Sequence, residues 1–226
     1  MKKLLTFVVF PVIIVALAYF IVSGINKPVK FDREQKAREK IAIQQLKDIR
    51  TLQNAYKSTY SHYAPTMDSL VDFYNNGHIK VVMMMGSEDD SVAVANTAAI
   101  KKKNPKITNE ELLNLYRQGQ KLVFNISTPI PVKDTLFNDN PSFNPESLRT
   151  IPFSGGDTVI MRSVIKVVSG VNVPLFEAQI PYPQLLKGMD EQLIVNLYHI
   201  RTDTDRYPGL MVGSIDNPNN NAGNWE

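Results

Sequence analysis

The sequence contains no cysteine, only three histidines and one tryptophan, and little net charge. The absence of cysteine excludes a disulfide scaffold and a thiolate metal site. The 25 basic and 22 acidic residues leave a formal net charge of +3, which argues against a nucleic-acid partner because phosphate neutralisation needs a concentrated basic face. With 226 residues, 43% of them hydrophobic, the composition is that of a folded domain with an appendage.

Catalytic motifs are also missing. The three histidines, His62, His78 and His199, show no H-x-x-x-H or H-E-x-x-H spacing, and no G-x-S-x-G, P-loop or G-x-G-x-x-G sequence occurs. A hydrolase would need a cluster such as His199 with Asp203 and Asp205 in one pocket. We therefore predict that the chain is not an enzyme and that it needs no cofactor.

The longest uncharged run, LLTFVVFPVIIVALAYFIVS at residues 4–23, follows two lysines. About 20 apolar residues suffice for a helix to cross a bilayer. Residues 1–26 are therefore predicted to form a signal-anchor that contacts inner-membrane lipid through residues 4–23. A cleaved signal peptide is the alternative, because Ala16-Leu17-Ala18 offers an A-x-A site. The apolar run continues past that site, which favours an uncleaved anchor.

Residues 27–63 are predicted to form a stem helix. The sequence has neither glycine nor proline from Val29 to Ala64, and its first half is charged on all sides. In the second half, apolar residues recur at spacings of three and four; they are Ala42, Leu46, Ile49, Leu52, Tyr56, Tyr60 and Tyr63. Such a stripe has to be buried, most simply against a sheet.

Residues 64–226 are predicted to form an α+β head. A short helix is expected at 67–76, and residues 86–120 read as an insertion in which Thr108 and Glu111 form the capping box of another helix. Residues 128–156 are expected to be a loop. Runs typical of strands occur at 79–85, 121–127, 158–168, 171–180, 193–201 and 210–214, with a hairpin turn at Ser169-Gly170. The predicted fold is therefore an α+β architecture in which a transmembrane helix continues into a long amphipathic helix packed on an antiparallel sheet.

Two motifs resemble type IV pilins and the pseudopilins of type II secretion. The helix end DIRTLQNAYKSTYSHYAPTMDSL is similar to the pilin stem, in which an aromatic-bearing helix ends at a G-x-Y-P turn; here that turn is the segment Ser61 to Pro65. The ending GSIDNPNNNAGNWE is similar to the pseudopilin C-terminus, with Gly213, Asp216 and Gly223-Asn224-Trp225 in the matching places. The prepilin cleavage glycine and the glutamate at the fifth mature position are absent.

The resemblance implies a single-pass, pilin-like envelope protein that stays anchored and has a structural or assembly role in a bacterial cell-envelope machine. Its partners would be envelope proteins or further copies of the chain, and its head would lie in the periplasm. Charge leaves the orientation open, because Lys2 and Lys3 resemble an export signal while the flank after the run is also basic. The alternative function is an anchored periplasmic module that binds peptidoglycan or another envelope ligand.

The resemblance also implies a calcium site in the C-terminal loop. The positions that match the pseudopilin ligands are Asp216, Asn219 and Asn221. Oxygen ligands suit Ca²⁺, although asparagine lacks the charge that gives tight binding. The alternative is an Asn-Pro-Asn-Asn turn held by side-chain hydrogen bonds to the backbone.

Overall fold

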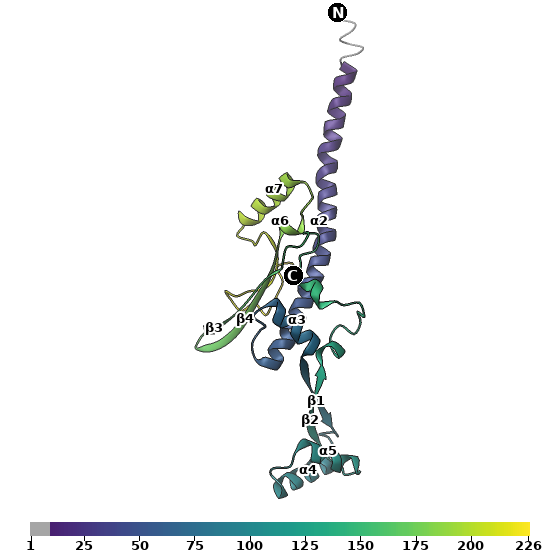
Figure 1. Cartoon of the computed structure of the whole chain (residues 1–226), viewed down its shortest axis with the longest axis vertical. Helices are drawn as coiled ribbons and strands as arrows, with labels where there is room; N and C mark the ends of the chain where they lie inside the picture. Colours follow the sequence, from purple (N-terminus) through teal and green to yellow (C-terminus); the bar gives the residue numbers. More distant parts are fainter. Residues whose placement is uncertain (1–9) are drawn as a thin grey trace, which may run out of the picture. The chain divides into compact units, whose positions relative to one another are not determined.

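The computed structural model describes residues 10–226, which form two compact units. The first unit contains residues 10–71 and 144–226, and the second contains residues 72–143. The predicted α+β class is confirmed, with one long helix and antiparallel sheets (Figure 1). The insertion expected at 86–120 lies inside the second unit.

The long helix, α2 (Phe10–Tyr60), contains 51 residues. The predicted apolar stripe is buried as far as the last turns, since Ala42, Leu46, Ile49 and Leu52 are fully inaccessible to solvent. The helix ends where Ser61 adopts a left-handed conformation with φ of 66°. The predicted end at residue 63 is therefore late by about one turn.

A three-stranded antiparallel sheet forms the other layer of the first unit, in the order β3-β4-β5. The predicted hairpin is confirmed as β3 (Ile160–Val168) and β4 (Val171–Pro181), and β5 (Gly209–Gly213) pairs with the far end of β4. Ser169 and Gly170 both have positive φ, 52° and 81°, as a two-residue turn matching the twist of the strands requires.

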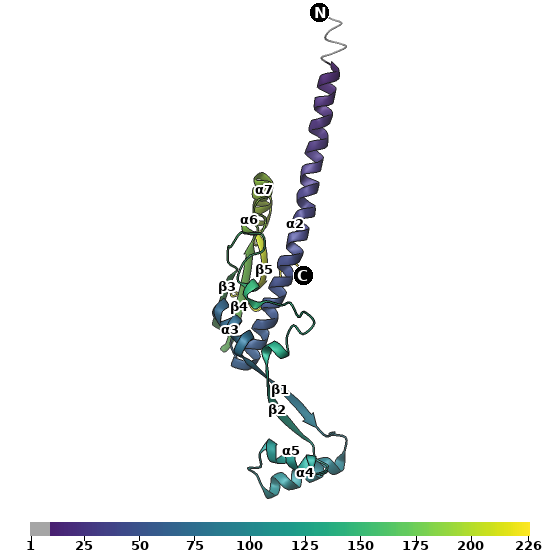
Figure 2. The same ribbon diagram turned by 45° about the vertical axis from the view of Figure 1, so that its right-hand side comes forward.

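The core of the first unit lies between α2 and one face of this sheet. Phe176, Ala178 and Ile180 alternate along β4, and their cross-strand neighbours Val212 and Leu210 lie on the same face. All five are at most 3% exposed. Figure 2 shows α2 beside β5, and α2 contacts β4 as well. The sheet face therefore supplies the partner that the apolar stripe of α2 requires.

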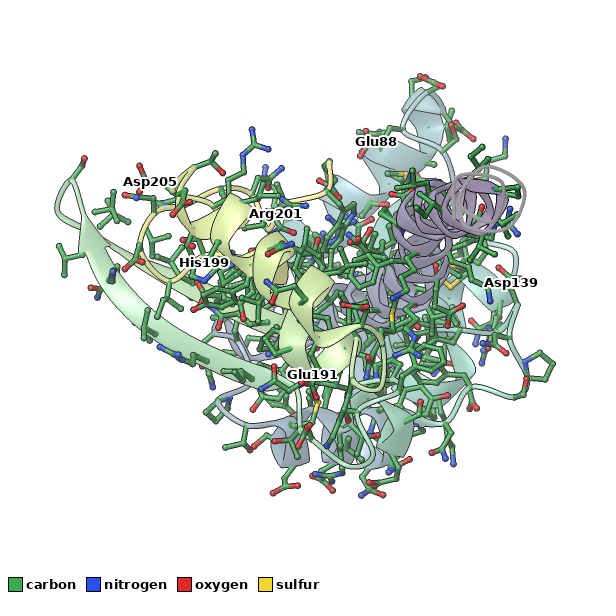
Figure 3. The ribbon with its side chains drawn as sticks, turned by 90° about the horizontal axis from the view of Figure 1, so that it is seen from above. Glu88, Asp139, Glu191, His199, Arg201 and Asp205 are labelled. Atoms are coloured by element: carbon green, nitrogen blue, oxygen red, sulfur yellow. The ribbon has the colours of Figure 1, made fainter. Side chains whose placement is uncertain are left out.

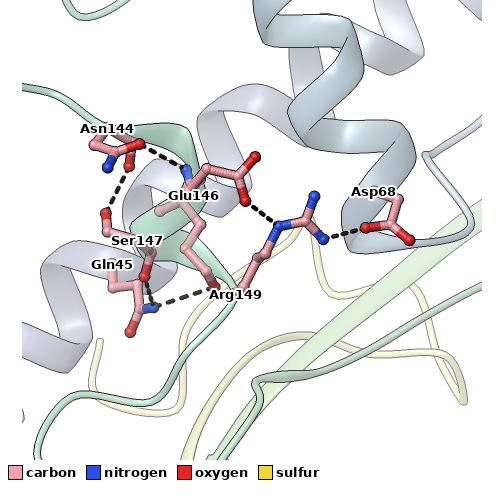
Figure 4. A network of polar contacts seen from close by, with 7 residues as sticks. Gln45, Asp68, Asn144, Glu146, Ser147 and Arg149 are labelled. Atoms are coloured by element: carbon pink, nitrogen blue, oxygen red, sulfur yellow. Dashed lines mark hydrogen bonds and ion pairs between the residues drawn. The ribbon is translucent and has the colours of Figure 1, made fainter. Parts of the chain in front are cut away.

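Polar contacts fix α2 to a short turn of 3-10 helix, η3 (Pro145–Leu148). The buried side chain of Gln45 donates through Nε2 to three backbone carbonyls at 2.8–3.2 Å, those of Ser147, Leu148 and Thr150. Figure 4 shows Gln45 beside Ser147. The neighbouring Arg149 is paired with both Asp68 and Glu146. The bonds from Gln45 satisfy three backbone carbonyls, of which that of Leu148 is buried.

Smaller elements complete the first unit. The short helix α6 (Tyr182–Leu185) follows β4, and α3 (Met67–Asn76) begins in the first unit and ends in the second. The helix α7 (Glu191–Thr202) replaces the strand that we predicted at 193–201, so that prediction is wrong. Its N-cap explains the difference, because the Asp190 carboxylate accepts a hydrogen bond from Leu193 N at 3.2 Å.

The second unit combines a two-stranded antiparallel sheet with two helices, which lie between its two strands in the sequence. Its elements are β1 (His78–Met85), α4 (Ser91–Lys103), α5 (Asn109–Arg117), β2 (Phe124–Pro131) and η2 (Val132–Asp134). The predicted capping box of Thr108 and Glu111 is confirmed at the start of α5. The strand β2 continues to Pro131, four residues further than expected into the predicted loop. The core of this unit contains Leu112, Leu122 and Phe124.

The predicted membrane anchor requires correction. No helix within residues 10–226 is both long enough and apolar enough to cross a membrane. Residues 4–9 of the predicted span lie outside the described residues. The described remainder of the run, 10–23, continues within α2 into charged sequence. The transmembrane helix, the signal-anchor and the inner-membrane placement with a periplasmic head are therefore not supported.

Candidate binding groove

A groove opens in the first unit between the end of α2, the beginning of β4 and the C-terminal loop, residues 214–226. Its volume is about 820 Å³, within the range of ~300–1,000 Å³ typical of ligand pockets. One wall is basic and polar, one is rich in amides, and the third is aliphatic. The lining residues are Arg50, Asn54, Lys57, Tyr63, Val173, Pro174, Leu175, Pro218, Asn219, Asn220 and Asn221.

The α2 wall follows from helical spacing. Arg50, Asn54 and Lys57 lie four and three residues apart, so their side chains share one face of the helix. This polar row runs beside the buried row that ends at Leu52. The helix consequently presents an apolar face to the sheet and a basic edge to the groove.

The opposite wall is a turn built from asparagines. Asn219 Oδ1 accepts a hydrogen bond from Asn221 N at 3.1 Å, and Ala222 N donates to the Asn219 carbonyl at 3.1 Å. Asn220 and Asn221 have positive φ, 54° and 57°, a conformation that asparagine tolerates better than most residues. The turn is therefore encoded locally by its own sequence.

Long-range hydrogen bonds hold this turn against α2. Asn221 Nδ2 donates to Asn54 Oδ1 at 2.9 Å and lies 2.8 Å from the Tyr63 hydroxyl. Arg50 Nη1 donates to the Asn221 carbonyl at 3.2 Å and to Glu226 Oε1 at 2.7 Å. The shape of the groove thus depends on contacts between α2 and residues more than 150 positions later in the chain.

The loop is also fixed to β5. Asn224 N donates to Met211 O at 2.9 Å, Met211 N donates back to Asn224 Oδ1 at 3.0 Å, and Asn224 Nδ2 donates to Gly209 O at 2.9 Å. Gly223 forms an isolated bridge with Val212. Asn224, one of the residues behind the pilin resemblance, therefore has a structural role at the edge of β5.

Lys57 supplies an uncompensated positive charge. Its Nζ lies 5.0 Å from the centroid of the Tyr63 ring and 3.4 Å from the Tyr63 hydroxyl. Within the described part of the chain, no carboxylate lies within ion-pair distance of Lys57. A half-buried lysine without a counter-ion favours an anionic ligand in the space beside it.

The predicted calcium ligands lie in this loop, but each has a partner of its own. The Asp216 carboxylate accepts from Lys166 Nζ at 3.3 Å, so a lysine already compensates its charge. Asn219 Oδ1 faces a backbone N–H, and the Asn221 carbonyl faces the cationic Arg50. These contacts favour the asparagine turn. Calcium binding at Asp216, Asn219 and Asn221 stays a prediction.

Within the described part of the chain, the side chains of His199, Asp203 and Asp205 form no hydrogen bond or ion pair with one another. Figure 3 shows His199 and Arg201 on α7 and Asp205 in the loop beyond it. His199 is exposed and makes an edge-on contact with Tyr198, while Asp203 caps the end of α7. Across residues 10–226, no group of three or more His, Cys, Asp or Glu side chains is arranged to hold a metal.

A buried tyrosine near α7 has a strongly perturbed pKa but a structural environment. Burial, followed by the nearby Glu39 carboxylate, raises the pKa of Tyr182, while Arg201 opposes the shift. The Tyr182 hydroxyl accepts from Arg201 Nη2 at 3.1 Å, and the Glu39 carboxylate on α2 lies near enough to raise the pKa of Tyr182. A phenol held protonated in this way links α2, α6 and α7 and is not available as a base.

Comparisons of the chain with protein-family models, with curated proteins and with solved structures found no match. Sequence reasoning overlooked the polar row of Arg50, Asn54 and Lys57, although its spacing of four and three residues was a readable signal. The burial predicted for Tyr63 is confirmed, since it is 4% exposed, but its second role, in which the hydroxyl accepts a hydrogen bond from Asn221, was not predicted.

Acidification is expected to release Glu226 from Arg50. The hydrogen bond from Arg50, reinforced by the positive charges of Arg50 and Lys47, keeps the pKa of Glu226 below its ordinary value of 4.5. Because the pKa of Glu226 is lowered in the folded state, the Arg50–Glu226 contact stabilises the fold fully above about pH 4.5. This stabilisation is lost as the pH falls through the lowered pKa. Titration of the Glu226 carboxyl by NMR measures this pKa.

The variant Arg50→Gln provides the comparison for this titration. It removes the guanidinium and should return the pKa of Glu226 toward its ordinary value. An unshifted pKa in the parent protein, or the same lowered pKa in the variant, would show that Arg50 does not hold the C-terminal residue.

Proposed function

We propose that this protein is a non-catalytic, pilin-like assembly subunit that associates with other copies or with partner proteins through the first half of α2. The observation that carries the proposal is the division of α2 into two parts. The second half is buried against the sheet, whereas the first half extends away from the other elements of its unit (Figures 1 and 2).

The exposed half of α2 displays large apolar side chains. Val12, Ile13, Ile14, Val15 and Leu17 are between 45% and 69% exposed. A contiguous apolar surface of this kind marks a contact with another molecule. Packing against a second helix would bury these residues and stabilise the association by about 25 cal/mol for each Å² of apolar area removed from water.

The architecture of the first unit supports the comparison with pilins. A long helix lies with its C-terminal half across an antiparallel sheet, and the C-terminal segment returns to both. The segments that carry the sequence resemblance lie at the helix end and at this returning segment. A binding module is the second candidate function, favoured by the groove beside Lys57.

Cysteine cross-linking tests the assembly proposal, because the chain has no cysteine of its own and every disulfide must involve the introduced residue. Single substitutions Val12→Cys, Ile14→Cys, Val15→Cys and Leu17→Cys are oxidised with copper phenanthroline in the purified full-length protein. We expect covalent dimers whose yield varies with the helical period, because ordered packing brings only one face of each helix close to its neighbour.

The matched control for this scan is Asp139→Cys, an exposed position in the second unit. It should cross-link only at the background level. Equal yields at every α2 position would indicate disordered aggregation, and yields no higher than that of the control would contradict assembly through α2.

A further inference from the structure

The strand β4 extends past its neighbour β5. Since β5 ends at Gly213 opposite Glu177, residues 171–176 pair only with β3 among the described strands. The Phe176 carbonyl oxygen faces Gly213, where it lies 2.3 Å from the position a side-chain Cβ would occupy. Because backbone groups alternate between the two sides of a strand, the Pro174 carbonyl faces the same side, beyond the end of β5. This part of β4 is an open edge.

Proline at this edge limits what can be added. Pro174 has no N–H, and its nitrogen faces the open side, so the ladder with β3 loses no bond. An incoming strand would find acceptors at Pro174 but no donor, which shortens any ladder it could form. The edge therefore suits a short extended segment held by few main-chain hydrogen bonds.

The side chains around this edge determine the charge of the segment. Val173, Pro174 and Leu175 are consecutive lining residues, so the groove follows the strand edge itself. Lys57 stands on the facing wall without a carboxylate partner, while Arg50 is already engaged by Glu226. An anionic side chain in the groove would meet Lys57 first.

The groove does not present the surface that a sugar ligand prefers. Tyr63, the aromatic residue among its lining residues, is only 4% exposed. Its ring packs 4.7 Å from the Phe176 ring, and Lys57 lies over it. The ring therefore offers its hydroxyl but no open face for stacking.

From this combination of open edge, unpaired lysine and aliphatic floor, we propose that the groove binds a short, extended, acidic peptide segment of a partner protein. The peptide carboxylates lie beside Lys57, its aliphatic side chains contact Val173 and Leu175, and its backbone lies along β4 near Pro174. This site is independent of the exposed half of α2, so it stands or falls separately from the assembly proposal.

Fluorescence anisotropy tests this site on the full-length protein. The probe is a labelled hexapeptide of alternating valine and glutamate, blocked at both ends, and the comparison peptides carry glutamine or lysine in place of glutamate. We expect only the glutamate peptide to bind, with an affinity that falls as salt is added. Amide NMR shifts confined to residues 171–176 and to the C-terminal loop support the proposed position.

Variants of Lys57 make the test specific. Lys57→Glu should weaken binding of the glutamate peptide roughly tenfold or more, because an attractive contact becomes repulsive. Lys57→Gln should weaken it by a smaller factor. The matched control is Lys40→Gln, which changes an exposed lysine elsewhere on α2. This variant should bind the glutamate peptide as tightly as the parent protein does. Thermal unfolding checks that each variant is folded. If Lys57→Glu is unfolded, the amide shifts that the peptide causes in the parent protein decide whether the groove is the binding site.

Several results would overturn the proposal. Equal binding of the glutamine peptide would show that charge does not select the ligand. Unchanged binding by Lys57→Glu would place the peptide elsewhere. Tighter binding of tetragalacturonate, lost in Lys57→Glu, would identify an acidic glycan site, and self-association lost in the same variant without peptide binding would identify a second copy as the occupant.

Discussion

Replacing Leu52 with aspartate is expected to unfold the first unit. Leu52 is fully buried on the face of α2 that packs against the sheet. Truncating such a residue to alanine costs about 2–5 kcal/mol, and an unpaired carboxylate in an apolar core adds a further penalty of several kcal/mol. Since domains are stable by only about 5–15 kcal/mol, the variant should lose cooperative thermal unfolding followed by near-UV circular dichroism.

The neighbouring Thr51 provides the control for this experiment. It is exposed on the other side of α2, where its hydroxyl donates to the Lys47 carbonyl at 2.9 Å. Thr51→Asp introduces the same charge one residue away and should change the free energy of unfolding by about 0.5 kcal/mol or less. A parent-like melting temperature for Leu52→Asp would refute the packing of α2 on the sheet.

The burial of the apolar stripe was predicted correctly and the strand at 193–201 was predicted wrongly, and the periodicity of the apolar residues explains both outcomes. Residues 42–52 match the helical spacing and no other, so their burial could be predicted. In the run from Leu193 to Ile200, apolar residues occupy neighbouring as well as alternating positions, and this pattern fits a strand and a helix equally well. The N-cap Asp190 was the deciding local signal, because it satisfies the backbone of the first turn.

The groove could be predicted only in pieces. The asparagine turn was one of the two alternatives considered for the C-terminal loop, and its local hydrogen bonds follow from its composition. The polar row on α2 could be predicted from its spacing. The contact between this row and the C-terminal loop could not, because Arg50 and Glu226 are 176 positions apart, and only the folded sheet brings them together. The open edge of β4 likewise depends on where β5 ends, which no local pattern specifies.

Replacing Gln53 with leucine is expected to destabilise the first unit by about 2–6 kcal/mol, although the side chain keeps nearly the same size. Gln53 is fully buried, and its amide forms a closed pair with Ala64, accepting from Ala64 N at 2.8 Å and donating to Ala64 O at 3.1 Å. Leucine would leave both backbone groups of the buried Ala64 without these bonds, at about 1–3 kcal/mol each. Urea denaturation measures the loss.

The control is Gln44→Leu, which removes an exposed amide that donates to Asp48 at 2.9 Å on the surface of the same helix. It should shift the free energy of unfolding by about 0.5 kcal/mol or less. Hydrogen exchange adds a local readout, since the Ala64 amide should exchange faster in Gln53→Leu while the amides of α2 remain protected. If Gln53→Leu is as stable as the parent, the turn after α2 is held by Pro65 and the packing of Tyr63, and the closed amide pair contributes nothing measurable to where the helix ends.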